Sequence, residues 1–351
     1  MKRLAAVYIL ISMMLMSANG LSQEYFTLNE LREQVVDGWN EVYTDKYGRQ
    51  IEVDIDVMVF GGDKAPVLKI GLPDYDEYTE VENNPYLSVT NVKKNGGQRT
   101  IVSEMYGKKI ELDRVYGDDY GNNLTPGEAY AFLKDHLVAQ GISSENFEFD
   151  IPKSFQVLCN TSQETGEVIS KPFYFIRLWP KLYNIPLLTH VMASFQKPGW
   201  PDYTPELTYM FRGEDEYAIG VSTFEEREII EEDIPLCSFE KIVQNIEKQI
   251  EAGYIQSVIS LRFGYVVYND PKIQSKKPVS IYDAEYCYAV PSWVLECKFV
   301  DNPQKDYSDS TATKCIAIDA QTGKMLDPFD KSKFSFANGD YKGCISWDKV
   351  K

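Results

Sequence analysis

Residues 286–297 read YCYAVPSWVLEC, and residues 315–326 read CIAIDAQTGKML. Both runs alternate large apolar side chains with other residues at a period of two, which is typical of β-strands. The polar stretch DNPQKDYSDS lies between them and favours a loop. Together they predict a pair of antiparallel strands around which the C-terminal part of the chain folds.

The register of this pair decides whether its cysteines can form a disulfide. One face of the first strand holds Trp293, Leu295, Cys297 and Phe299, and the more apolar face of the second holds Ile316, Ile318 and Ala320. A slip of one residue would turn a whole face toward water, so the apolar faces should pair. We therefore predict that Cys297 is buried and does not bond Cys315. Six cysteines in an exported protein permit up to three bridges elsewhere.

The first twenty residues have the pattern of an export signal. Lys2 and Arg3 give a positive start, Leu4 to Met16 carry no charge, and small residues precede Leu21. The apolar run is shorter than the roughly 20 residues of a transmembrane helix. We predict cleavage near Gly20 and a secreted, periplasmic or other cell-envelope protein without a transmembrane span. An uncleaved short anchor is the alternative.

The charge balance excludes some partners. The chain has 53 acidic against 36 basic residues, a net charge of −17. Such a chain repels the phosphates of nucleic acids and of anionic lipids. We therefore predict no nucleic-acid partner.

Three helices are predicted: two begin after the N-caps Thr27 and Thr125, and the third runs from Ser238. The stretches TLNE and TPGE add a glutamate three residues after the cap, which forms a capping box. Apolar residues follow each of the three starts at helical spacing, and after Thr27 this spacing continues through Trp39 to Val42. Most other apolar residues alternate as in strands.

This mixture predicts an α+β fold in which antiparallel sheets are each packed by a helix. The second and third helices are separated by the same interval as the aromatic strands FYFIRLW and EYCYAVP, which suggests tandem helix-plus-sheet units. The predicted divisions are a signal peptide at 1–20, an N-terminal α+β segment at 21–120, and helix-plus-sheet units at 121–235 and 236–351.

The C-terminal unit, with PSWVLECKFV followed by CIAIDAQTGKML, resembles the PepSY-type and YycI-type extracytoplasmic modules of bacteria. The N-terminal TLNELREQVVDGWNEVY and the middle YNIPLL resemble uncharacterised secreted or lipid-anchored Firmicutes proteins. The resemblance implies an envelope-associated binding or regulatory protein rather than an enzyme. The chain departs from lipid-anchored relatives because its first cysteine is Cys159, far from the predicted cleavage point.

The sequence predicts no catalytic residue, no metal site and no cofactor. Its two histidines, His136 and His190, lie within predicted elements, where we interpret them as structural. HExxH, CxxC, GxSxG and phosphate-loop patterns are missing from the sequence. With so many acidic residues, two carboxylates at glycosidase spacing remain possible, so a carboxylate-based hydrolase is kept as an alternative.

Exposed aromatic residues offer a candidate ligand site. The loop KPGWPDY contains Trp200 and Tyr203, whose rings suit stacking against a sugar or a peptide. The tryptophan could instead pack against its own sheet. The leading hypothesis is a non-catalytic exported protein that binds or regulates another envelope or extracellular protein. A glycan- or peptide-binding module at Trp200 is the second.

Overall fold

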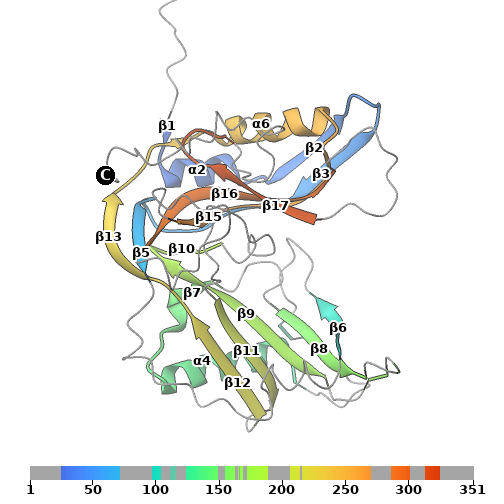
Figure 1. The fold of residues 1–351 in the computed structure, drawn as a ribbon, viewed down its shortest axis with the longest axis vertical. Coiled ribbons are helices and arrows are strands. Elements are labelled where there is room, and N and C mark those ends of the chain that lie inside the picture. Colours follow the sequence, from blue (N-terminus) through green and yellow to red (C-terminus); the bar gives the residue numbers. More distant parts are fainter. Residues whose placement is uncertain are drawn as a thin grey trace, which may run out of the picture.

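The computed structural model describes residues 25–71, 97–103, 124–148, 155–162, 172–188, 206–213, 216–269, 286–300 and 313–324, with positions 112, 113, 115, 165, 167 and 168 between them. Figure 1 shows two lobes, each built on one large β-sheet. We call the lobe with the six-stranded sheet the upper lobe and the lobe with the seven-stranded sheet the lower lobe. The predicted export signal lies outside the described residues.

The three predicted helix starts are confirmed. The helices are α2 (Leu28–Gln34), α4 (Pro126–Ala139) and α6 (Phe239–Glu251). Thr27 and Thr125 each cap their helix in a complete capping box, in which the side chain accepts from a backbone N–H and the glutamate accepts from the cap. Ser238 caps α6 by accepting from the Lys241 backbone N–H at 3.2 Å.

The first helix is shorter than predicted. It ends at Gln34, and Trp39 begins the strand β2 (Trp39–Thr44), which pairs with β3 (Gln50–Ile55). Gly38 separates them with a φ of 72°, a left-handed conformation that favours glycine. Trp39 and Tyr43 are buried on the same side of β2, and a spacing of four residues suits a strand as well as a helix.

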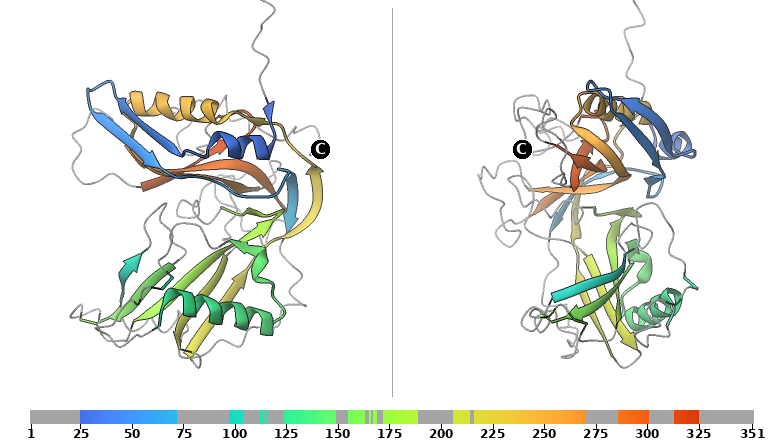
Figure 2. Two further views of the ribbon diagram at one scale, coloured as in Figure 1. Left: turned by 180° about the vertical axis from the view of Figure 1, so that it is seen from behind. Right: turned by 90° about the vertical axis from the view of Figure 1, so that its right-hand side faces the viewer.

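The upper sheet runs in the order β13-β5-β16-β15-β4, with β17 also paired to β16. The strands are β4 (Val57–Val59), β5 (Val67–Gly71), β13 (Glu225–Glu231), β15 (Ile255–Asn269), β16 (Cys287–Phe299) and β17 (Thr313–Asp319). All pairings are antiparallel except that of β4 with β15. The sheet curls into a half-barrel (Figure 2).

The predicted register of β16 and β17 is confirmed. Trp293 lies opposite Ile318, so the apolar faces of the two strands coincide. Cys297 lies opposite Lys314, whereas Cys315 lies opposite Glu296 on the other face. Cys297 is fully buried, and no disulfide joins it to Cys315.

The lower sheet runs in the order β12-β11-β9-β8-β6, with β7 and β10 also paired to β9. Its strands are β6 (Gly97–Ser103), β7 (Phe147–Glu148), β8 (Phe155–Thr161), β9 (Phe173–Leu182), β10 (Ile185–Pro186), β11 (Glu206–Gly213) and β12 (Glu216–Ser222). Helix α4 covers one face through Ala129, Leu133 and Leu137, which share a core with these strands. A separate two-stranded sheet pairs β1 (Tyr25–Phe26) with β14 (Leu236–Cys237).

The predicted α+β class is wrong, because the fold is rich in β-structure. The described residues contain seventeen strands but three α-helices. The upper sheet is not a unit formed by α6 and the strands that follow it, since β4, β5 and β13 complete it from earlier in the chain. The strands of the N-terminal segment predicted at 21–120 are divided, with β4 and β5 in the upper sheet and β6 in the lower.

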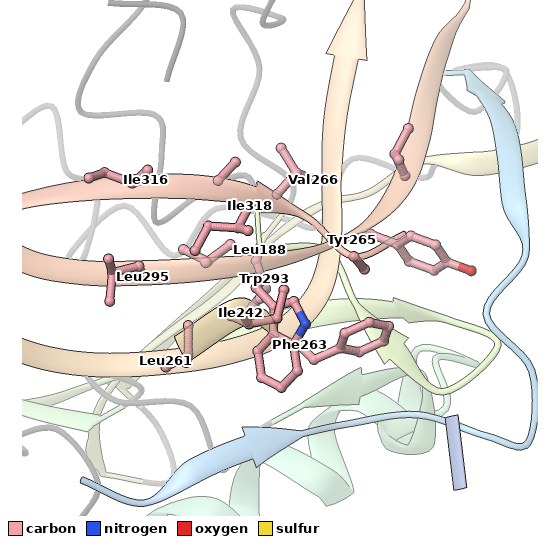
Figure 3. Close-up of a cluster of buried hydrophobic side chains, with 14 of the residues drawn as sticks. Leu188, Ile242, Leu261, Phe263, Tyr265, Val266, Trp293, Leu295, Ile316 and Ile318 are labelled. Atoms are coloured by element: carbon pink, nitrogen blue, oxygen red, sulfur yellow. The ribbon is translucent and has the colours of Figure 1, made fainter. Parts of the chain in front are cut away.

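The core of the upper lobe lies between α6 and the curled sheet (Figure 3). Ile242, Ile246 and Ile250 of α6 are fully buried, and burial of each such side chain contributes about 1.5–3 kcal/mol. Trp293 is in contact with two aromatic rings, because its centroid lies 5.7 Å from that of Phe239 and 5.6 Å from that of Phe263.

The two lobes share this core through one hairpin of the lower lobe. After β10, the Leu188 backbone N–H donates to the Tyr265 carbonyl at 2.7 Å. Leu187 forms a parallel bridge with Tyr265, so this segment lies along the same edge of β15 as β4, just beyond the end of β4. Gly264 allows the approach, since a Cβ atom there would lie 2.6 Å from the Leu188 side chain. Ile185 is buried in the same core. The hairpin therefore fixes the lobes to one another.

Candidate functional site

The ligand-binding residues that the sequence predicts, Trp200 and Tyr203, lie outside the described residues. The same is true of His190. A glycan or peptide site in that loop therefore stays a prediction. The described residues offer other candidates, in the interior and on the surface.

A buried ion pair crosses the upper sheet. Arg262 of β15 donates from Nη2 to Glu296 Oε2 at 3.0 Å and to Ser260 Oγ at 2.7 Å. All three side chains are buried. Ser260 lies directly opposite Glu296 in the register, so the guanidinium reaches across to β16 on the diagonal.

Other buried polar residues lie on the same face of the sheet. The alternation of the strands places five together: Ser260, Arg262, Ser292, Glu296 and Asp319. The Asp319 carboxylate accepts from the backbone N–H groups of Gln321 and Thr322 at 2.9 and 2.7 Å. These two bonds close the turn DAQTG at residues 319–323, which follows β17. Asp319 therefore has a structural role.

The ion pair ties β15 to β16 rather than forming a reactive group. Its two charges compensate one another, and removing one partner would leave a buried charge unpaired. Sequence reasoning missed it. A signal was present, because Arg262 and Glu296 interrupt the apolar runs SLRFGYVV and WVLECKF at positions where alternation alone suggests a solvent-facing side chain.

His136 belongs to an aromatic cluster between α4 and the lower sheet. Its ring stacks on Tyr217 with centroids 3.8 Å apart, and Nδ1 hydrogen-bonds the Tyr209 hydroxyl at 3.0 Å. Burial lowers the pKa of His136 below its ordinary value. The histidine therefore has the packing and the partner of a structural residue, consistent with its place beside the apolar stripe of α4.

Strand β13, at the edge of the upper sheet, is exposed and acidic. The stretch EEREIIEED from Glu225 to Asp233 contains six acidic residues and one arginine. Among the described strands β13 pairs only with β5, and it forms the edge of the fold between the lobes (Figure 1). The Glu228 side chain is 60% exposed, that of Glu232 is 82% exposed, and Ile229 is 41% exposed between them. We call Glu225–Asp233 the acidic edge.

Nearby cations only partly neutralise the acidic edge. Lys69 lies 3.6 Å from Glu228, and Lys64 lies 3.6 Å from Glu232. Ion pairs at such exposed positions contribute about 0–1 kcal/mol, so these carboxylates can exchange their partners readily. The acidic composition of this run is visible in the sequence, but its position at the edge of a sheet is not.

Within the described part of the chain, no three His, Cys, Asp or Glu side chains are grouped as metal ligands. No described helix is both long enough and apolar enough to cross a bilayer.

The comparisons with known proteins leave the family open. No family model matches the chain, and no curated protein matches it. Among solved structures, the chain is similar to an uncharacterized protein from Eubacterium rectale ATCC 33656, at 11% sequence identity and a TM-score of 0.46. The match covers 86% of this chain and 97% of that one. The resemblance to PepSY-type and YycI-type modules stays a prediction.

Proposed function

We propose that this chain is an exported, non-catalytic protein that binds a basic, extended segment of another envelope or extracellular protein. The observation that carries the proposal is the acidic edge, an exposed edge strand whose side chains are mostly of one charge. Export is supported by the signal-like pattern of residues 1–20.

A binding role agrees with the chemistry of the interior. Glu296 is engaged by Arg262, and His136 by Tyr209. These groups would be the first candidates for acid–base catalysis among the described residues, yet each is committed to packing within the fold. In the part of the chain that the structure describes, the exposed carboxylates of Glu225 and Glu228 are instead held only by solvent-exposed ion pairs, which a basic partner can replace.

An edge strand can accept a further strand through its outward backbone groups, and the side chains then select the partner. The charge of the acidic edge selects against a second copy of the same strand, because like charges would be placed opposite one another. A basic strand is attracted for the same reason. Ile229 supplies an apolar contact between the carboxylates.

The proposal is tested with a short fluorescent peptide that alternates lysine and valine, and with its glutamate–valine counterpart. Fluorescence anisotropy should show that the lysine peptide binds and the glutamate peptide does not. Added salt should weaken the binding of the lysine peptide. Reversing two charges, Glu228→Lys with Glu232→Lys, should weaken binding by about tenfold or more. Glu33→Lys with Asp37→Lys, an equal change at two exposed positions in and just after α2, should leave it nearly unchanged. Equal binding of both peptides, or equal loss in the control, would contradict the proposal.

A further inference from the structure

Lys69 of β5 lies between an exposed carboxylate and an aromatic ring. Its Nζ atom is 3.6 Å from Glu228 Oε2 and 4.0 Å from the centroid of the Tyr286 ring. A cation so close to the face of a ring is attracted by the quadrupole of that ring. The Lys69 ammonium is therefore held from two sides.

The strand register brings these groups together. Strand β5 lies between β13 and β16 (Figure 1), and Lys69 is directly opposite Glu228 on β13 and Tyr288 on β16. Residues that lie directly opposite one another share a face of the sheet. Tyr286 precedes Tyr288 by two residues, and the two rings form an edge contact with centroids 5.7 Å apart. Lys69 thus has the carboxylate on the outer side and the tyrosines on the inner side.

Exposure falls from the edge of the sheet inward. The Glu228 side chain is 60% exposed, that of Lys69 is 27% exposed, and Tyr288 is buried. An ion pair with an exposed carboxylate contributes little, whereas contact of a cation with a ring gains strength where water is partly removed. Because the stem of a lysine is flexible, its ammonium can move from one to the other. The Tyr286 ring can therefore hold Lys69 without the help of Glu228.

We infer that Lys69 is an internal competitor for a lysine of the partner, and that Tyr286 receives Lys69 when the partner binds. In the unbound chain the Lys69 ammonium occupies Glu228 of the acidic edge. A strand added to β13 places one side chain directly opposite Glu228, on the same face. A lysine at that position takes the carboxylate, and Lys69 withdraws onto the Tyr286 ring.

This inference rests on the proposed binding of a basic strand, and it adds the residues that set its affinity and selectivity. A partner with an uncharged side chain opposite Glu228 leaves the Lys69 ion pair in place and gains nothing from the carboxylate. A partner with a lysine there gains the carboxylate but must displace Lys69. The competition therefore favours partners that carry a cation at this one position.

Fluorescence anisotropy with the lysine–valine peptide tests the competition. Lys69→Met removes the ammonium but keeps an unbranched side chain, and should tighten binding of the peptide about fivefold. Lys69→Gln, which is also uncharged, should give the same gain. Lys64→Met is the matched control, because it removes the same charge from a more exposed ion pair, 3.6 Å from Glu232. Its gain should stay below about twofold.

Tyr286 distinguishes competition from a simple change of net charge. Tyr286→Leu should weaken binding of the peptide about threefold, because the ring stabilises Lys69 most after its release from Glu228. In the Lys69→Met background the same change should have no effect, since the group that the ring receives is gone. Tyr286→Phe keeps the ring and should bind the peptide as the unaltered chain does.

The outcomes separate this inference from the proposed function. Equal gains from Lys69→Met and Lys64→Met would reduce the effect to net charge, and would overturn the inference while peptide binding itself stands. An equal effect of Tyr286→Leu with and without Lys69 would likewise overturn it. If the lysine peptide bound neither the unaltered chain nor any variant, the proposed function would fail as well.

Discussion

At the scale of single residues, burial rather than sequence pattern decides the role of the charged groups. Arg262 and Glu296 lie in strands whose alternation suggests that both side chains face solvent. Both are buried, because the sheet face that they share is covered. Sequence alone does not reveal this, because covering a face is a property of distant segments. His136 was easier to interpret, since it lies beside an apolar helical stripe.

Breaking the buried ion pair from one side should be strongly destabilising. Glu296→Ala leaves the Arg262 guanidinium buried without its carboxylate, and should lower the free energy of unfolding by about 3–5 kcal/mol in urea titrations. Replacing both residues, Arg262→Met with Glu296→Leu, removes both charges and should cost clearly less. A double variant as unstable as Glu296→Ala would contradict a role limited to mutual compensation.

The lowered pKa of His136 predicts a pH dependence of stability. A histidine whose pKa is lower in the folded than in the unfolded state binds a proton first in the unfolded state. Stability should therefore fall as the pH drops below the ordinary value of 6.5, and reach its plateau above it. Melting temperatures between pH 5 and 8 measure this, since carboxylates titrate mostly below that range. His136→Gln should show a weaker decrease; an unchanged decrease would assign it to other groups.

At the scale of elements, helix starts and strand register could be predicted, but helix length could not. The caps at Thr27 and Thr125 are local chemistry, and the register of β16 with β17 follows from hiding one face of each strand. Helix α2 ends early because the residues after it form β2, which pairs with β3. That pairing is not shown by the helical spacing of the apolar residues. Strand β16 continues through Pro291, at the point where its neighbour changes from β5 to β17.

Gly38 should be essential for the change from helix to strand. An alanine there would need its φ of 72° and would place Cβ 2.8 Å from the Ile55 carbonyl oxygen. We expect Gly38→Ala to cost more than the roughly 1–2 kcal/mol of the left-handed conformation alone. Gly48→Ala is the matched control, because Gly48 has a φ of 81° but no atom within 4 Å of the added Cβ. Chemical denaturation of the two variants gives the comparison, and equal losses would rule out the close contact.

At the scale of the whole molecule, the sequence suggested units that follow one another along the chain. In the fold, segments from different parts of the chain share one sheet. The upper sheet combines strands from before and after the lower lobe, and the lower lobe returns Leu187 and Leu188 to the upper core. Pairing between segments so far apart leaves little trace in a single sequence. The acidic run could be recognised from its composition, but its place at a sheet edge between the lobes could not.

The shared core predicts that the lobes unfold together. Calorimetry should show a single transition for the native chain, because Ile185, Leu187 and Leu188 of the lower-lobe hairpin are buried in the upper core. Gly264→Val places side-chain atoms where Leu188 packs, and should separate the transition into two. Two transitions in the unaltered chain would mean that the hairpin does not couple the lobes.

The most direct test of the proposed function is hydrogen exchange of the β13 amides with and without the lysine–valine peptide. Addition of a strand to the acidic edge should protect the outward-facing amides between Glu225 and Glu231, while amides of the β2–β3 ribbon stay unchanged. The glutamate–valine peptide should protect neither. Binding of the lysine peptide without new protection in β13, or with protection located elsewhere, would contradict the acidic edge as the binding surface.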